Sequence, residues 1–311
     1  MNDRVDSQAG AQPTKGIQGI QGIQGIQGIQ EIQEIQGIQE IQATQARQAG
    51  APPSDTMIAI DGVSKRYGDF QALERVDMNI ARGEFVVLLG ASGCGKSTLL
   101  NLITGFDEPT TGSIRVNGRE VKGIDPHCGM VFQQYALFPW LSVLDNVAFG
   151  LKMKGIDKAT RHATARRYIE MVGLKGFEDR YPKALSGGMR QRVSIARVLA
   201  NDPDVILLDE PFAALDAMTR QVLQEELLQI YQKSGKTIVF ITHSIDEALM
   251  LSTRMVIMSA RPGRVACDMP NDLPMPRDAQ VQLSPRYNEL KSQIWNTVQT
   301  EVMRSLESQA A

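Results

Sequence analysis

The sequence predicts an α/β domain over residues 57–270, and three features of that segment indicate it. Short β-branched runs alternate with longer amphipathic stretches, as in a sheet covered by helices. Two of the runs, at 85–89 and 205–208, are apolar throughout, which is typical of buried strands. One of these two runs leads straight into a glycine-rich loop and a predicted helix.

The order of the expected elements is that of a sheet core with a helical insert. We expect strands at 57–63, 84–89, 113–116, 129–132, 205–208, 237–241 and 255–258. We expect helices to begin at or near Lys96, Val143, Lys158, Gly187, Ala217 and Ile245. The stretch of about 141–186 has helical periodicity and no clear strand, so we expect it to form a helical subdomain.

The two ends of the chain differ from this domain. Residues 16–42 are nine tandem triplets of Gly-Ile-Gln or Glu-Ile-Gln, and a period of three matches neither a helix nor a strand. We therefore expect residues 1–56 to be a disordered low-complexity tail and linker, with an adhesive or partner-binding segment as the alternative. Residues 271–311 are expected to be a C-terminal extension with one helix, because apolar residues at 290, 294, 298 and 302 share one face.

Composition argues against several classes of protein. The 33 Lys and Arg residues and the 35 Asp and Glu residues give a net charge of −2, so we expect no nucleic-acid partner. Three widely spaced cysteines indicate a reducing compartment rather than a disulfide framework or a zinc site. No signal peptide is recognisable, and no apolar run approaches the roughly 18 residues that span a bilayer. We therefore expect the protein to reach a membrane only through a partner.

The glycine-rich loop at 90–98 has the sequence of a phosphate-binding loop, Gly-Ala-Ser-Gly-Cys-Gly-Lys-Ser-Thr. Its glycines let successive N–H groups turn toward phosphate oxygens, and the helix that begins at Lys96 adds the positive end of its dipole. Lys96 would neutralise the β- and γ-phosphates, and Ser97 would offer its hydroxyl to Mg²⁺. The nucleotide contacts expected in this loop are Gly90, Ser92, Gly93, Cys94, Gly95, Lys96, Ser97 and Thr98.

The second aliphatic run, at 205–208, ends in two carboxylates. A carboxylate at the C-terminal edge of a buried strand lies where α/β sheets bind their ligands. We therefore expect Asp209 to hold Mg²⁺ through water and Glu210 to polarise the water that attacks the γ-phosphate. Two exposed loop acids are the alternative interpretation.

Between these motifs stands Leu185-Ser-Gly-Gly-Met-Arg-Gln-Arg192, and with it the sequence resembles the ATP-binding cassette (ABC) subunits of membrane transporters over about residues 57–270. The resemblance implies a P-loop NTPase fold of ABC type, with a mixed sheet core and a helical subdomain. It assigns Ser186, Gly187 and Gly188 to the signature motif of the family, a second anion site at a helix N-terminus. It also implies a head-to-tail homodimer that binds ATP between the phosphate loop of one copy and the signature motif of the other.

Four further residues match positions of the family one by one. Tyr67, in the run Lys-Arg-Tyr-Gly, matches the aromatic residue that stacks on adenine. Gln133 matches the glutamine that reaches Mg²⁺ and the attacking water, and His243 matches the histidine that contacts the γ-phosphate. Asp216 matches the loop that couples the two sites. The departures from the family pattern remove no catalytic group; they are Met189, Ser244 and Ala91.

Shorter motifs resemble the nitrate, sulfonate and taurine importer branch of the family. They include Leu137-Phe-Pro-Trp140, Asp145-Asn-Val-Ala-Phe-Gly150 and Arg261-Pro-Gly-Arg264. This branch implies a peripheral subunit on the cytoplasmic face of the inner (cell) membrane. It also implies two permease subunits and a solute-binding protein that acts through them. Aliphatic sulfonates or taurine are the first expectation for the solute and nitrate is the second, while other small organic molecules stay open.

Two other classes share part of this pattern. A soluble ABC ATPase without a membrane partner usually carries two cassettes, or long coiled-coil or zinc insertions. This chain has one cassette, a short helical insert and no cysteine pair. A metabolic kinase with the same phosphate loop would not explain the motif at 185–192 or His243. The sequence therefore favours an ATPase that energises solute import.

Overall fold

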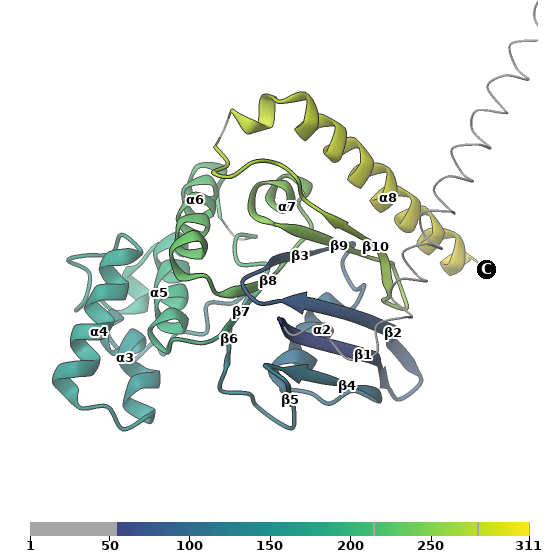
Figure 1. The fold of residues 1–311 in the computed structure, drawn as a ribbon. Helices are drawn as coiled ribbons and strands as arrows, with labels where there is room; N and C mark the ends of the chain where they lie inside the picture. Colours follow the sequence, from purple (N-terminus) through teal and green to yellow (C-terminus); the bar gives the residue numbers. More distant parts are fainter. Residues whose placement is uncertain (1–54, 214, 279, 311) are drawn as a thin grey trace, which may run out of the picture. The chain divides into compact units, whose positions relative to one another are not determined.

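Two β-sheets share a core with one helix in the part of the chain that the computed structural model describes, residues 55–213, 215–278 and 280–310 (Figure 1). The predicted tail at 1–56 lies outside the described residues, apart from its last two positions.

The larger sheet has six strands in the order β10-β9-β3-β8-β7-β6. Five of them run parallel, and β10 is antiparallel to β9. The strands are β3 (Phe85–Leu89), β6 (Cys128–Val131), β7 (Val205–Asp209), β8 (Thr237–Thr242), β9 (Arg254–Met258) and β10 (Val265–Pro270). The first five are confirmed to within one residue at each end, whereas the sequence analysis expects no strand at β10.

The smaller sheet is antiparallel and has the order β2-β1-β4-β5. Its strands are β1 (Thr56–Tyr67), β2 (Phe70–Ala81), β4 (Thr111–Val116) and β5 (Arg119–Glu120). Neither β2 nor β5 is among the strands predicted from the sequence. In β2 the buried residues Val76, Met78 and Ile80 alternate with exposed polar residues, which is the pattern of a strand with one buried face.

Alternation along the strands divides the core between the two faces of the larger sheet. In β3, Phe85, Val87 and Leu89 belong to the cluster on one face, and Val86 and Leu88 belong to the cluster on the other. The second cluster also contains the apolar side chains of α2 (Lys96–Thr104) and of the smaller sheet. The helix α2 therefore packs between the two sheets, with its first residue just beyond the end of β3 (Figure 1).

Helices cover the first face of the larger sheet. They are α5 (Gly187–Ala200), α6 (Ala217–Ser234), α7 (Ile245–Leu251) and α8 (Pro285–Ala310). Leu290 and Ile294 of α8 are buried in this core, on the apolar face that the sequence analysis expects. The extension thus packs on the domain with the predicted side of its helix.

A helical subdomain adjoins the sheet at α5 (Figure 1). It contains α3 (Val143–Met153), α4 (Lys158–Met171) and the short 3-10 helix η1 (Pro182–Ala184). Ser142 and Asp157 cap α3 and α4 by accepting backbone N–H groups of the first turn. These helices all lie within the stretch of about 141–186 for which a helical insert is predicted.

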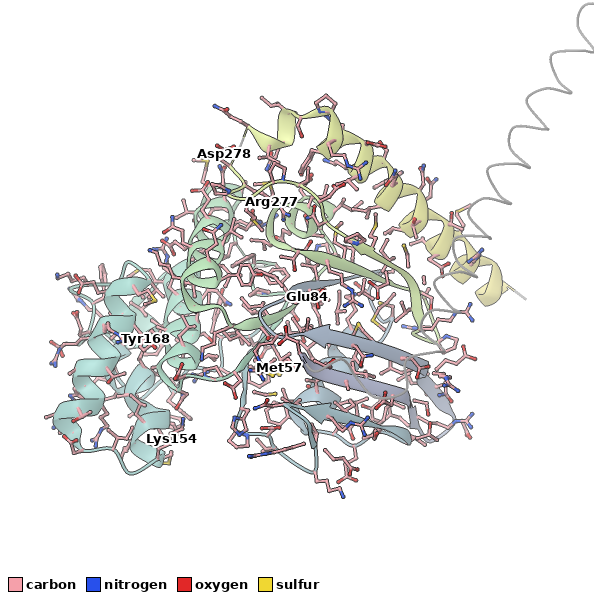
Figure 2. All side chains as sticks on the ribbon, viewed as in Figure 1. Met57, Glu84, Lys154, Tyr168, Arg277 and Asp278 are labelled. Atoms are coloured by element: carbon pink, nitrogen blue, oxygen red, sulfur yellow. The ribbon has the colours of Figure 1, made fainter. Side chains whose placement is uncertain are left out.

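The segment between β10 and α8 passes over the C-terminal end of α7. Arg277 of this segment contacts that end of the helix (Figure 2). It also contains the short 3-10 helix η2 (Val281–Leu283). Across the described residues, no helix combines the length and the apolar character needed to cross a bilayer.

Candidate functional site

The loop at 90–98 connects β3 to α2 and directs the first turn of α2 toward the carboxyl edge of the sheet. Gly95 caps α2 with a φ of +89°, and a Cβ there would lie 2.5 Å from the Cδ2 of Leu73. Only glycine fits this position. Lys96 is 5% exposed, and its Nζ donates to the carbonyls of Gly90 (2.8 Å) and Ala91 (3.0 Å). The loop therefore holds the buried lysine against its own backbone carbonyls.

Two carboxylates face this loop from the end of β7. The hydroxyl of Ser97 donates to Oδ1 of Asp209 at 3.1 Å. Burial raises the pKa of Asp209, the neighbouring Glu210 raises it further, and the contacts with Ser97 and Lys96 oppose that shift only in part. Asp209 is thus a partly desolvated carboxylate whose charged form would gain from a cation.

Glu210 has a left-handed backbone with a φ of +42°, which is uncommon for a residue with a side chain. Its N–H donates to the carbonyl of Ile241 at the end of β8 (3.2 Å). Its Oε2 lies 3.4 Å from Nδ1 of His243, the first residue after β8. The geometry therefore brings together the acid and the histidine, which are far apart in the sequence.

A cavity of about 460 Å³ opens between the loop and these carboxylates, and we call it the phosphate-loop cavity. Nine of the predicted site residues line it: Ser92, Gly93, Gly95, Lys96, Ser97, Thr98, Gln133, Asp209 and Glu210. Gly90 and Cys94 do not line it, and the side chain of Cys94 is buried behind the loop. The volume lies in the range of small-molecule and cofactor pockets.

Two lining residues with functional side chains are not predicted from the sequence. Phe70 is half exposed and pairs with Tyr67 at the tip of the β1–β2 hairpin. Tyr67 itself does not line the cavity, and its hydroxyl donates to Asp107 at 2.6 Å. Burial and this contact with Asp107 raise the pKa of Tyr67 to about 12. An aromatic residue three positions from Tyr67 was the sequence signal available for Phe70.

Arg261 is the other unpredicted lining residue, and it reaches the cavity from the segment that joins β9 to β10. Its guanidinium lies 2.9 Å from the point that a Cβ of Gly93 would occupy. Backbone bonds join the same segment to β2, where Gly263 donates to Ala72 and accepts from Glu74. A Cβ on Gly263 would lie 2.1 Å from the carbonyl oxygen of Cys94, so this segment presses against the back of the phosphate loop.

The remaining predicted residues form a separate group, which we call the signature group: Ser186, Gly187, Gly188 and Asp216. Ser186 caps α5 by accepting the N–H of Met189 (3.3 Å), and Asp216 caps α6 by accepting the N–H of Thr219 (3.0 Å). A Cβ on Gly188 would lie 2.6 Å from Cγ2 of Thr219, so the two helix N-termini approach closely. None of the four residues lines the phosphate-loop cavity.

Comparison with known proteins identifies the family. A family model described as ABC transporter matches residues 73–213. An uncharacterized ABC transporter ATP-binding protein of Methanocaldococcus jannaschii is 52% identical over 236 residues, which is 76% of this chain and 87% of the relative. The chain belongs to the ABC transporter family. It is an ATP-binding subunit of that family, and the predicted ATPase class is confirmed.

Further comparisons agree with this assignment of the ABC subunit. A taurine import ATP-binding protein of Roseobacter denitrificans is 44% identical over 268 residues, which is 82% of this chain and 100% of the relative. The predicted resemblance to the nitrate, sulfonate and taurine branch is thereby confirmed. A dimeric ATP-binding cassette, solved in a post-hydrolysis state with ADP and Pi, has a TM-score of 0.62 and 35% identity. That match covers 69% of this chain and 98% of the solved one.

Proposed function

We propose that this ABC subunit hydrolyses ATP at sites shared between two copies of the chain and thereby drives import of a small anionic solute. The observation that carries this proposal is the separation of two anion-binding groups in one chain. Lys96 and the loop amides line one cavity, whereas the signature group lies at two other helix N-termini. A second copy arranged head to tail would bring a signature group to each cavity.

The residues of the cavity, with His243 and Tyr67 next to its lining residues Glu210 and Phe70, fit the steps of phosphoryl transfer. The loop amides and Lys96 bind and neutralise the β- and γ-phosphates. Glu210 orients the attacking water and accepts its proton, and His243, 3.4 Å away, contacts the γ-phosphate. Tyr67, or Phe70 beside it, supplies the stacking surface for adenine.

The donor set at the cavity also suits Mg²⁺. Ser97, Gln133 and Asp209 all line it, and they offer the hydroxyl, amide and carboxylate oxygens that this ion prefers. When bound, Mg²⁺ would offset charge on the phosphate oxygens. The chain's own part is to keep the hydroxyl of Ser97 and the carboxylate of Asp209 in contact at the edge of the cavity.

The transport role follows from the relatives rather than from the cavity. Homologues named as taurine import ATP-binding proteins support taurine or a related aliphatic sulfonate as the solute. Nitrate is our second candidate. The subunit would sit peripherally on the cytoplasmic face of the cell membrane, bound to two permease subunits. A solute-binding protein would act through the permease. Asp216, beside the signature motif, would couple the two ATP sites.

Two variants test the assignment of the cavity. Lys96→Ala should weaken ATP affinity about 10- to 100-fold, because the polyphosphate loses a charged donor. Glu210→Gln should keep ATP affinity but slow hydrolysis about 100-fold or more, because the shape stays and the base is lost. Equilibrium binding of ATP and steady-state hydrolysis separate the two effects. Normal hydrolysis by Glu210→Gln would refute the role of Glu210.

A mixing experiment tests the shared site. Lys96→Ala and Ser186→Arg variants should each be inactive alone. A mixed dimer joins the intact loop of one with the intact signature of the other, so the mixture should regain part of the activity. Hydrolysis that stays first order in protein, by a chain that remains monomeric with ATP, would refute the shared site. Uptake of labelled taurine and nitrate by cells that produce wild type or Glu210→Gln tests the solute.

A further inference from the structure

Glu247 is a buried carboxylate that the proposed mechanism does not use. It belongs to the first turn of α7 and is 7% exposed, and burial raises its pKa. Its Oε2 accepts the hydroxyl of Thr242 at 2.5 Å, and its Oε1 accepts Nε2 of Gln224 at 3.3 Å. Burying a charged group is costly. The hydrogen bonds that fix both oxygens of Glu247 therefore indicate that the position of this carboxylate serves a role.

Glu247 fixes the chain on both sides of His243. The Thr242 hydroxyl that donates to Glu247 also accepts the N–H of Ser244 (2.9 Å). The hydroxyl of Ser244 in turn accepts the N–H of Glu247 (3.3 Å). The side chain of His243 stays 62% exposed and faces Glu210. These hydrogen bonds hold the backbone on both sides of His243, while its ring remains accessible to a ligand.

Glu247 is also linked to the signature group, through Arg220 of α6. Nη2 of Arg220 donates to the carbonyl of Leu215, the residue before Asp216, at 2.9 Å. Nε of Arg220 lies 3.8 Å from Oε1 of Glu247, which is an ion pair but too long for a hydrogen bond. This Nε is buried and has no hydrogen-bond partner among the described residues. A shift of the Leu215–Asp216 turn can therefore shorten or lengthen this pair.

We propose that Glu247 and Arg220 are positioning residues that couple the Asp216 loop to His243 within one chain. The inference rests on the proposed role of His243 at the γ-phosphate. Arrival of a second copy at the signature group would move the Asp216 loop, and the pair would transmit that movement to Thr242 and to His243. Neither Glu247 nor Arg220 lines the phosphate-loop cavity, and Glu247 is only 7% exposed, so both would act through other residues.

The test compares steady-state kinetics and ATP binding of full-length variants. Glu247→Gln keeps the shape but removes the charge that faces Arg220, so kcat should fall about tenfold while KM and ATP affinity stay within about twofold. Thr242→Val removes the hydroxyl next to His243 and should do the same, even if Glu247→Gln fails to fold. Glu226→Gln is the matched control. Glu226 also lies on α6 and pairs with Arg192 at 2.9 Å, so its kcat should not change.

Combination with His243→Ala shows whether the effect passes through the histidine. On that background, Glu247→Gln should lower the residual kcat no further. A full additional loss there, or a wild-type kcat for both Glu247→Gln and Thr242→Val while His243→Ala is slow, would overturn this inference alone. A wild-type kcat for His243→Ala would overturn both the inference and the proposed role of His243.

Discussion

Arg277 lies in the segment before α8 and is buried (Figure 2). Among the described residues no carboxylate accepts a hydrogen bond from it, and its removal should weaken the attachment of the extension. Its guanidinium donates to the carbonyls of Leu249 (2.9 Å) and Ser252 (2.5 Å) at the end of α7. It also donates to the carbonyl of Leu273 at 3.0 Å. Burial lowers the pKa of Arg277 to about 10. The substitution Arg277→Ala removes these hydrogen bonds.

The contacts determine the size of the expected effect. Asn271 Nδ2 also donates to Leu249 O (2.9 Å) and Ser252 O (3.0 Å), so these two carbonyls keep a partner in Arg277→Ala. Leu273 O loses both donors that Arg277 supplies, which costs about 1–3 kcal/mol. The buried methylenes of the stem add about 0.8 kcal/mol each, and release of the desolvated charge offsets part of the sum. We expect a net loss of about 2–4 kcal/mol.

Urea unfolding of the full chain, followed by circular dichroism, measures this loss. Arg286→Ala is the matched control, because Arg286 belongs to the same extension but is exposed and pairs only with surface carboxylates, so it should have little effect. The double variant Arg277→Ala/Asn271→Ala should lose more than the sum of the single variants, since together they remove both side-chain donors to Leu249 O and both to Ser252 O. A loss below about 1 kcal/mol for Arg277→Ala, or strict additivity, would refute the reasoning.

Three further outcomes are expected. Burial raises the pKa of Asp246, but hydrogen bonds from a lysine and from Tyr287 outweigh this and lower it. Tyr287→Phe should therefore cost about 1 kcal/mol of unfolding free energy at pH 7, and the gap should close as the pH falls and Asp246 takes up a proton. Gly105→Ala should cost about 3 kcal/mol or more, because its Cβ would lie 1.8 Å from a backbone oxygen. Gly118 has a similar positive φ but open space around it, so Gly118→Ala should cost only about 1–2 kcal/mol of unfolding free energy. Equal losses for the two variants in thermal or urea unfolding would contradict this reasoning. A chain that starts at Thr56 should keep the melting temperature and the ATPase rate of the full chain, and a large drop in either would show that the repeat contributes to the fold.

The helix starts and the buried strands could be predicted because their signals are local. Ser186, Asp216 and Ser244 each precede a helix and accept an N–H of its first turn, so the capping residue marks the boundary. The short apolar runs of β3 and β7 are buried on both faces, and their length and β-branched residues favour strands. The strand β10 lies at the sheet edge, half exposed and ending in Pro270, and therefore has no comparable pattern.

The residues of the site also divide into those that local sequence signals predict and those that they do not. The lysine and the serine follow β3 after the glycine-rich loop, and the two carboxylates stand at the end of β7, so the motif and its context agree. Phe70 and Arg261 reach the cavity from a hairpin tip and from the segment after β9. Their proximity depends on the pairing of Leu73 with Gly263, a contact between distant segments that no local pattern encodes. Tertiary pairing, rather than propensity, decides this part of the site.

That pairing has a consequence for dissection of the gene. The family match ends at residue 213, yet the segment around Gly263 wedges behind Cys94 and hydrogen-bonds to β2. A fragment trimmed to the matched region would retain every residue of the phosphate loop and still lack the wall that supports it. Residues 259–264 are therefore part of the smallest unit that can be expressed, transplanted or circularly permuted with its nucleotide pocket intact.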